Sequence, residues 1–168
     1  MGAAKPGIAH ADMAGVERMN ITDKARTITN ARVTGPALLH LSWSDETVAD
    51  INLGAILKDR AFSALRDFDE FAKVEVGDWG HSLSWPSGAE MGADMLWLET
   101  LSATGHDDVR TFLEWRGRHA LSLSKAADAL GVSRRTVAYY SNGEKKVPKP
   151  ILLACRGWEV INGMHQAA

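Results

Sequence analysis

The sequence predicts an α+β fold, in which a small antiparallel-sheet domain with short helices is followed by an all-α domain. Three observations support this prediction. Apolar and polar residues alternate through much of residues 26–85, as in strands with one buried face. From residue 107 onward the apolar residues recur at helical spacing instead. Within that part, Gly131 separates two short segments that each begin with a serine able to cap a helix.

The composition is that of a globular protein. The 168 residues, 45% of them hydrophobic, are enough for one large or two small domains. Cys155 is the only cysteine, which excludes an internal disulfide and fits a reducing compartment. No apolar run approaches membrane-spanning length, and the N-terminus lacks the apolar segment of a secretory signal. We therefore expect a cytoplasmic protein with no membrane partner.

Charge is distributed unevenly along the chain. Residues 1–104 contain 9 Lys and Arg against 15 Asp and Glu, whereas residues 105–168 contain 10 against 6. The C-terminal part is therefore basic although the whole chain has a net charge of −2. A basic module joined to an acidic one is typical of a nucleic-acid-binding end attached to a domain with a different role.

The predicted sheet domain covers residues 26–101 and follows a flexible tail at residues 1–25. Strands are expected at 27–33, 39–43 and 47–53, and the turns between them make an antiparallel meander. The remaining elements are short helices between 54 and 71, strands at 73–76 and 82–85, and a helix at 93–101 with Met95, Leu98 and Leu101 on one face.

Three tryptophans, Trp43, Trp79 and Trp85, lie on or beside the expected strands. Each can bury a large apolar area, so we expect all three in the core. Two of them exposed on one edge would instead mark an interaction surface.

The helical domain is expected at residues 107–162, after a short linker. The first helix has Val109, Phe112 and Leu113 on its apolar face. The last helix begins near Pro150, and its buried stripe is predicted to be Ile151, Ala154, Cys155, Trp158 and Ile161.

Two short helices between these form a helix-turn-helix pattern. Ser122 can cap the first, and Ala127 is small enough to let a second helix cross closely. Gly131 can adopt the left-handed conformation that ends the first helix, after which Ser133 can cap the second. Val137 and Tyr140 then point back to the core.

The second of these helices is predicted to enter a DNA major groove. Arginine can pair bidentately with guanine or grip phosphate, which suits Arg134 and Arg135 at the start of the helix. The candidate DNA-binding residues are Ser122, Ser133, Arg134, Arg135, Thr136, Ala138, Tyr139, Asn142, Lys145 and Lys146.

Five of these residues also have a simpler interpretation. Arg134 and Arg135 are alternatively solvated surface residues, and Lys145 and Lys146 a solvated pair in a turn. Tyr139 fits a thymine methyl or sugar contact, or equally a dimer interface. The helical pair as a whole is alternatively a hairpin used only for protein contacts.

The run Leu121-Ser122, Ala126-Ala127, Leu130-Gly131-Val132-Ser133, Thr136-Val137, Tyr140 and Asn142-Gly143 resembles the lambda-repressor-like family of Cro and XRE regulators. The resemblance covers roughly the last third of the chain and implies a DNA-binding domain. This chain departs from the family at Leu123, where many members place a glutamine that touches a phosphate.

The front part resembles a small bacterial family known as domain of unknown function 2442. The most specific match is Trp85-Pro86-Ser87-Gly88-Ala89-Glu90, and the likeness covers roughly residues 26–98. Members of that family occur alone, fused to helix-turn-helix domains, or beside small toxin-like proteins. The resemblance implies a fold and no established activity.

The chain lacks the motifs of an enzyme or a metalloprotein. The six histidines are scattered without metal-ligand spacing, and there is no phosphate loop or dinucleotide fingerprint. The run Gly80-His81-Ser82-Leu83-Ser84 lacks the second glycine of a nucleophile elbow. We expect no catalytic residues, no metal and no cofactor.

Two hypotheses follow. In the first, the protein is a sequence-specific DNA-binding regulator, which binds a two-fold operator as a homodimer with half-sites about 34 Å apart. In the second, it is a protein-interaction module whose front domain binds a partner, for example a small toxin-like protein, while the helical end only dimerises. An antitoxin that represses its own operon would combine both.

Overall fold

Strands β1 (Ile28–Gly35), β2 (Leu38–Trp43) and β3 (Val48–Asn52) form the antiparallel meander that the alternation predicts. Leu39 lies opposite Ile51, and Leu41 opposite Ala49. Because side chains alternate across a strand, this register puts all four on one face, where they are buried. The computed structural model describes residues 26–166, so the tail expected at residues 1–25 lies outside the described residues.

A second, smaller sheet follows in the order β4-β5-β6. Its strands and the connecting segments are η1 (Ile56–Lys58), η2 (Arg60–Arg66), α1 (Phe68–Phe71), β4 (Glu75–Val76), η3 (Asp78–Gly80), β5 (Ser82–Ser84) and β6 (Glu90–Gly92). The strand expected at 73–76 is thus only two residues long, and both are exposed. Strand β6 was not expected, because three residues are too few to display an alternation.

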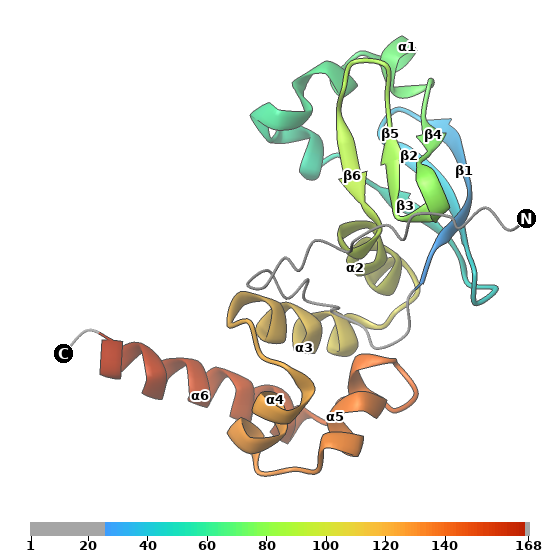
Figure 1. The fold of residues 1–168 in the computed structure, drawn as a ribbon. Coiled ribbons are helices and arrows are strands. Elements are labelled where there is room, and N and C mark those ends of the chain that lie inside the picture. Colours follow the sequence, from blue (N-terminus) through green and yellow to red (C-terminus); the bar gives the residue numbers. More distant parts are fainter. Residues whose placement is uncertain (1–25, 167–168) are drawn as a thin grey trace, which may run out of the picture.

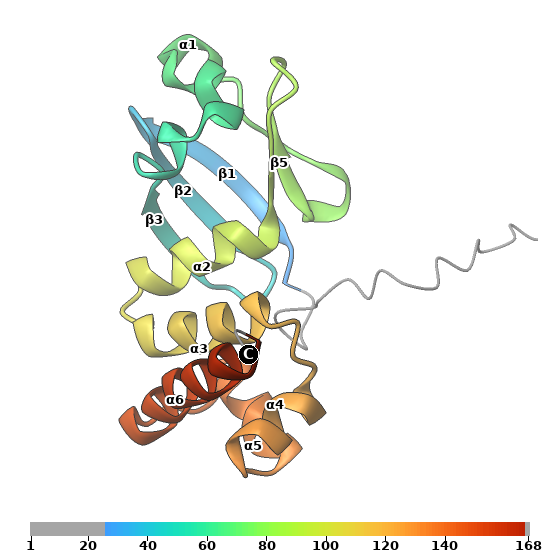
Figure 2. The ribbon, with the colours of Figure 1, turned by 90° about the vertical axis from the view of Figure 1, so that its left-hand side faces the viewer.

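Five helices complete the chain: α2 (Ala93–Ala103), α3 (Asp107–Arg118), α4 (Leu123–Leu130), α5 (Arg134–Ser141) and α6 (Lys149–Gln166). Figures 1 and 2 show α2 lying between the strands and α3, with the remaining helices beyond α3. The fold is therefore mixed α+β, as predicted. None of the described helices is both long and apolar enough to cross a membrane.

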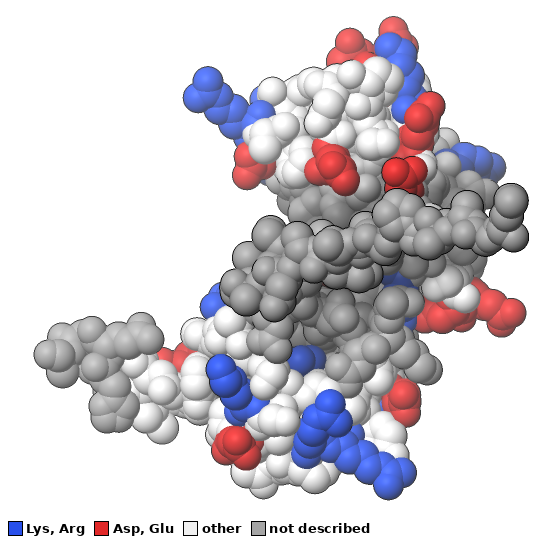
Figure 3. All heavy atoms as spheres, viewed as in Figure 1, with Lys and Arg blue, Asp and Glu red and all other residues white. Residues whose placement is uncertain are grey.

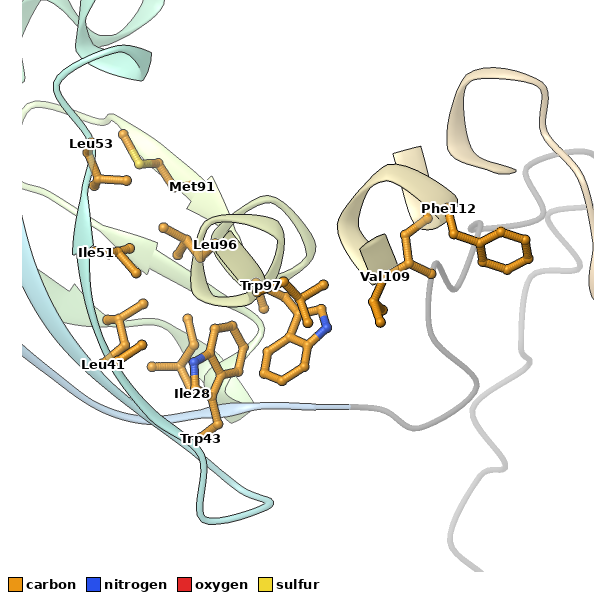
Figure 4. Packing of buried hydrophobic residues seen from close by; sticks show 14 of the residues in the cluster. Ile28, Leu41, Trp43, Ile51, Leu53, Met91, Leu96, Trp97, Val109 and Phe112 are labelled. Atoms are coloured by element: carbon orange, nitrogen blue, oxygen red, sulfur yellow. The ribbon is translucent and has the colours of Figure 1, made fainter. Parts of the chain in front are cut away.

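Helix α2 is covered on two sides, which explains why its predicted buried face was only partly right. Leu101 is buried as predicted, but Met95 and Leu98 are only partly buried. Leu96 and Trp97, which were not predicted, are buried as well. Leu96 faces the strands and Trp97 lies toward α3, whose Val109 points back at α2 (Figure 4). A helix packed between two layers has no single apolar stripe, so helical spacing alone identifies only part of the buried surface.

A single hydrophobic cluster extends from the sheets through α2 into the helices beyond. The turn at residues 104–106 joins α2 to α3 without interrupting it. Trp43 spans part of this core, since its indole packs edge-on against Trp97 at 5.1 Å and donates a hydrogen bond of 3.1 Å to Thr100 Oγ1. Trp43 and Trp85 are buried as predicted, but Trp79 is not.

Candidate nucleic-acid interface

The corner between α4 and α5 has the geometry that its sequence predicts. Ser122 Oγ accepts a hydrogen bond of 3.2 Å from Lys125 N at the start of α4. Gly131 ends that helix with φ of 66°, and Ser133 Oγ accepts a hydrogen bond of 3.0 Å from Thr136 N at the start of α5. Both caps and the left-handed turn are therefore confirmed, and they fix the direction in which α5 leaves the corner.

The inner side of α5 is held by apolar packing and by one buried cation. Tyr140 packs edge-on against Phe112 of α3, with ring centroids 5.7 Å apart. Arg116 of α3 is only 4% exposed, and its Nη1 donates a hydrogen bond of 2.6 Å to Ser141 Oγ at the end of α5. Its Nε also donates to the carbonyl oxygen of Leu121, just before α4. Arg116 thus joins α3, α4 and α5.

The outer side of α5 carries the predicted arginines. Arg134 and Arg135 are both exposed. Arg135 Nε donates a hydrogen bond of 2.5 Å to the Tyr139 hydroxyl, and Lys145 Nζ lies 4.8 Å from the centre of the Tyr139 ring. We call Arg135, Tyr139 and Lys145 the Tyr139 cluster. Among the described residues, Arg134 has no hydrogen-bond or ion-pair partner, so its guanidinium is available to a ligand.

The loop after α5 is tied down beside this cluster. Val147 N donates a hydrogen bond of 2.8 Å to Asp108 Oδ2 in the first turn of α3. Val147 itself is buried, whereas the preceding Lys145 and Lys146 are exposed. The anchored loop therefore holds Lys145 beside Tyr139 of α5, and Lys146 follows it as an exposed residue.

The other predicted contacts are less uniform in exposure. Ser122 and Ser133 are exposed at their helix starts, while Thr136 and Ala138 are partly buried. Thr136 also bonds to Ser133, with 2.8 Å between the two hydroxyl oxygens.

Asn142 lies at the end of α5 and is partly buried, and its DNA contact stays a prediction. Its carbonyl oxygen accepts a hydrogen bond of 2.9 Å from Arg26 Nη2, and its Oδ1 is buried without a hydrogen-bond partner. Arg26 also pairs with Asp45 at 2.7 Å and lies 4.2 Å from the centre of the Trp97 ring. The end of α5 therefore faces the sheet half of the molecule.

Burial opposes ionisation of Asp45, but the hydrogen bonds from Arg26 and Thr47 outweigh it, so the pKa of Asp45 lies below its ordinary value. Asp45 stays charged near neutral pH and holds Arg26 in place. Sequence inspection did not find Arg26, because its contacts lie 19 and 116 residues away. Arg116, by contrast, follows Leu113 by three residues on the buried face of α3, and that position was a detectable clue.

Surface charge differs between the helical half and the sheet half of the molecule. On the face shown in Figure 3, Lys and Arg outnumber Asp and Glu over the helices at the foot of the molecule. Acidic residues are more frequent over the sheet half. The helical end therefore offers a cationic surface for an anionic ligand.

The described residues contain no group of His, Cys, Asp and Glu that could hold a metal ion.

A capped helix-turn-helix corner with cations on its outer helix defines the structural class of this protein. The chain is similar to the Nitrosomonas europaea ATCC 19718 protein NE0471, whose crystal structure is described as that of a "putative DNA binding protein". The two share 35% identity with a TM-score of 0.63 over 80% of this chain and 86% of the other. The chain belongs to the same family as that protein. No family model and no curated protein matches it.

Proposed function

We propose that this protein is a sequence-specific DNA-binding transcriptional regulator, whose last helices form a lambda-repressor-like helix-turn-helix domain. Helix α5 enters the major groove with its N-terminal end toward the bases. The observation that carries the proposal is the exposed pair Arg134 and Arg135 at the start of α5, on the outer side of a corner whose inner side is fully packed.

The proposed contacts follow from the chemistry of each side chain. One of the two arginines reads a guanine edge through paired hydrogen bonds, and the other grips a phosphate. Lys145 and Lys146 neutralise backbone phosphates from the anchored loop. Tyr139 packs on a sugar or a thymine methyl, with Arg135 and Lys145 close enough to orient its ring.

Further support comes from the Nitrosomonas europaea relative, since its description names DNA as the ligand of that protein. One helix-turn-helix module offers few base contacts, so the regulator is proposed to act as a homodimer on a two-fold operator. An antitoxin that represses its own operon is one form of such a regulator, and the front domain's resemblance supports it. We expect the protein to work in the cytoplasm.

Replacing Arg135 with alanine tests the proposal. If Arg135 reads a base, the change costs about 1–3 kcal/mol of binding free energy on the selected operator and relaxes sequence preference at one position. The operator is first selected from random DNA, and binding is then measured by fluorescence polarisation. Because several cations meet phosphate, affinity should also fall steeply as salt rises.

Arg60→Ala is the matched control, since Arg60 is an exposed arginine in the sheet half. It removes the same charge and should leave operator affinity unchanged. Equal losses for Arg60→Ala and Arg135→Ala would mean that net charge, not the outer face of α5, determines binding. Recovery of no preferred sequence from random DNA would refute a sequence-specific regulator.

Trp79 favours a second candidate function, a protein-interaction module in the front domain. Its side chain is 87% exposed although tryptophan rarely stands free in solvent. Its backbone has φ of 60°, a strained conformation for a bulky residue. The following Gly80 is required, because a Cβ there would meet the Ile28 carbonyl oxygen at 2.3 Å. The fold thus holds an indole outward at an energetic cost.

The second candidate is tested with the product of a neighbouring gene as the partner, for example a small toxin-like protein. If Trp79 is the anchor of that contact, Trp79→Ser weakens binding by about 2 kcal/mol or more, as hot-spot tryptophans do. Val48→Ser is the control, because Val48 is another exposed apolar residue of the same domain. Calorimetry that gives equal affinities for both variants would remove Trp79 from the interaction surface.

A further inference from the structure

Helix α6 exposes an apolar stripe that the rest of the described chain leaves uncovered. Leu153, Val160 and Ile161 are 55%, 55% and 59% exposed, and Ala154 and Gly157 are also exposed. At about 100° per residue, these five positions fall within an arc of about 120° on the helix. No Lys, Arg, Asp or Glu of α6 lies in that arc. This corrects the prediction that Ala154 and Ile161 belong to the buried stripe.

The opposite side of α6 is the one that packs. Cys155 is buried there, and Trp158 packs edge-on against Trp115 of α3 at 5.7 Å. Glu159 accepts hydrogen bonds of 2.8 Å from Arg118, the last residue of α3, and from the following His119. The outer part of the helix extends past α3 and α4 (Figure 1). The stripe is therefore held in one orientation and remains open to another molecule.

The stripe is complementary to itself. If two copies of α6 cross antiparallel at Gly157, Leu153 of each copy meets Ile161 of the other. Ala154 then meets Val160, so a small side chain faces a larger one. This pairing is the isologous arrangement that a two-fold axis requires, in which the same surface serves both subunits.

Gly157 leaves room for a close crossing at the centre of the stripe. A glycine inside a helix costs about 1 kcal/mol relative to alanine, so it calls for a structural reason. Within the described chain no such reason exists, because a Cβ at Gly157 would meet no atom within 4 Å. The close approach of a second helix backbone supplies one.

We infer that α6 is the homodimer interface of this protein, and that it pairs antiparallel with α6 of a second copy across a two-fold axis at Gly157. This inference rests on the proposed function, because a two-fold operator is bound by two copies of α5 and the dimer would supply them. A single helix pair buries less than the roughly 1,600 Å² of a standard stable interface. The dimer in free solution is accordingly weak, and a two-fold operator strengthens it.

Sedimentation of the full chain over a wide concentration range tests the interface without DNA. The wild type should pass from monomer to dimer as concentration rises. Ile161→Lys places a charge in the stripe and should keep the chain monomeric over the same range. Gly163→Lys is the control, because Gly163 is exposed on the same helix but outside the arc, and it should dimerise like the wild type.

Disulfide trapping is a second test, which does not require the fold to tolerate a lysine in α6. Gly157→Cys should form a covalent dimer under mild oxidation, since the two thiols meet at the axis, whereas Gly163→Cys should not. Native Cys155 does not interfere, because it is buried and burial raises its pKa to about 12. A wild type that stays monomeric, or equal trapping at 157 and 163, would overturn the inference, and the stripe would then serve a different partner.

The failure of this inference is distinguishable from failure of the proposed function. If only the interface is wrong, Arg135→Ala still weakens operator binding while Ile161→Lys has no effect on assembly. If only DNA binding is wrong, the wild type still dimerises through α6 but selects no DNA sequence.

Discussion

Arg116 and Arg135 lie in the same helical half of the molecule but in opposite surroundings. Arg116 is buried and bonds to Ser141 and to the Leu121 carbonyl, so its charge is used to join three helices. Arg135 is exposed, and within residues 26–166 its guanidinium contacts Tyr139 on the next turn of α5. A buried cation with several acceptors is a structural group, whereas an exposed one is available for a ligand.

This difference predicts opposite effects of the same substitution. Arg116→Met leaves buried acceptors without a donor and should lower the free energy of unfolding by about 1–3 kcal/mol. Arg134→Met, on the exposed start of α5, should change it by less than about 0.5 kcal/mol but weaken DNA binding. Urea unfolding of both variants measures the comparison. A fully stable Arg116→Met protein would show that the buried contacts do not hold the corner together.

At the level of single residues, local chemistry was predictable and distant contacts were not. Ser122, Gly131 and Ser133 were identified because a cap or a left-handed turn depends on neighbours within four positions. The partial burial of Asn142 was not predictable, because its carbonyl oxygen accepts a hydrogen bond from Arg26, far away in the sequence. A helix position predicts whether a side chain can point outward, but not what covers it.

Helix α6 shows how one element can have two different faces. Its inner face is fixed to α3 by Glu159, which accepts hydrogen bonds from Arg118 and His119. These hydrogen bonds outweigh the effect of burial and hold the pKa of Glu159 below its ordinary value of 4.5. Its outer face carries the uncharged stripe. The orientation of the proposed dimer surface therefore depends on an ionised carboxylate on the other side of the helix.

The lowered pKa of Glu159 predicts the direction in which stability changes with pH. The contribution of Glu159 to stability is fully present above the ordinary pKa of the carboxyl group and is lost as pH falls through the lowered value. Wild type should therefore be more stable than Glu159→Gln at pH 7, and the difference should vanish in acid. Urea unfolding at several pH values measures it, with the exposed Glu144→Gln as a charge-matched control that shows no difference. A constant gap at all pH values would contradict this assignment.

The strands of the meander were predictable from the sequence, whereas the buried faces of α2 and α6 were predicted only in part. The alternation in β2 and β3 correctly gave Leu39, Leu41 and Ile51 as core residues. In α2 the spacing rule was right for Leu101 but missed Leu96 and Trp97, because strands cover one side of this helix and α3 the other. In α6 it failed for Ile161 because the apolar pattern continues where no described part of the chain covers the helix.

On the scale of the whole molecule, the α+β class and the helix-turn-helix corner follow from the sequence, but the joining of the two halves does not. Residues 102–107 read as a linker between independent units. In the structure that segment includes the ends of two helices that pack on each other, and one core runs through both halves. Packing between segments is decided by three-dimensional shape, which a one-dimensional pattern does not record.

Arg26 links the two halves of the molecule, and this link allows binding at one half to affect binding at the other. It connects Asp45 in the sheet half to the carbonyl of Asn142 at the end of the helix proposed to read DNA. A molecule that binds the front half and makes these Arg26 contacts more or less stable would change the affinity of the protein for the operator by some factor. Linkage then requires that occupancy of the operator shift the affinity for that molecule by the same factor.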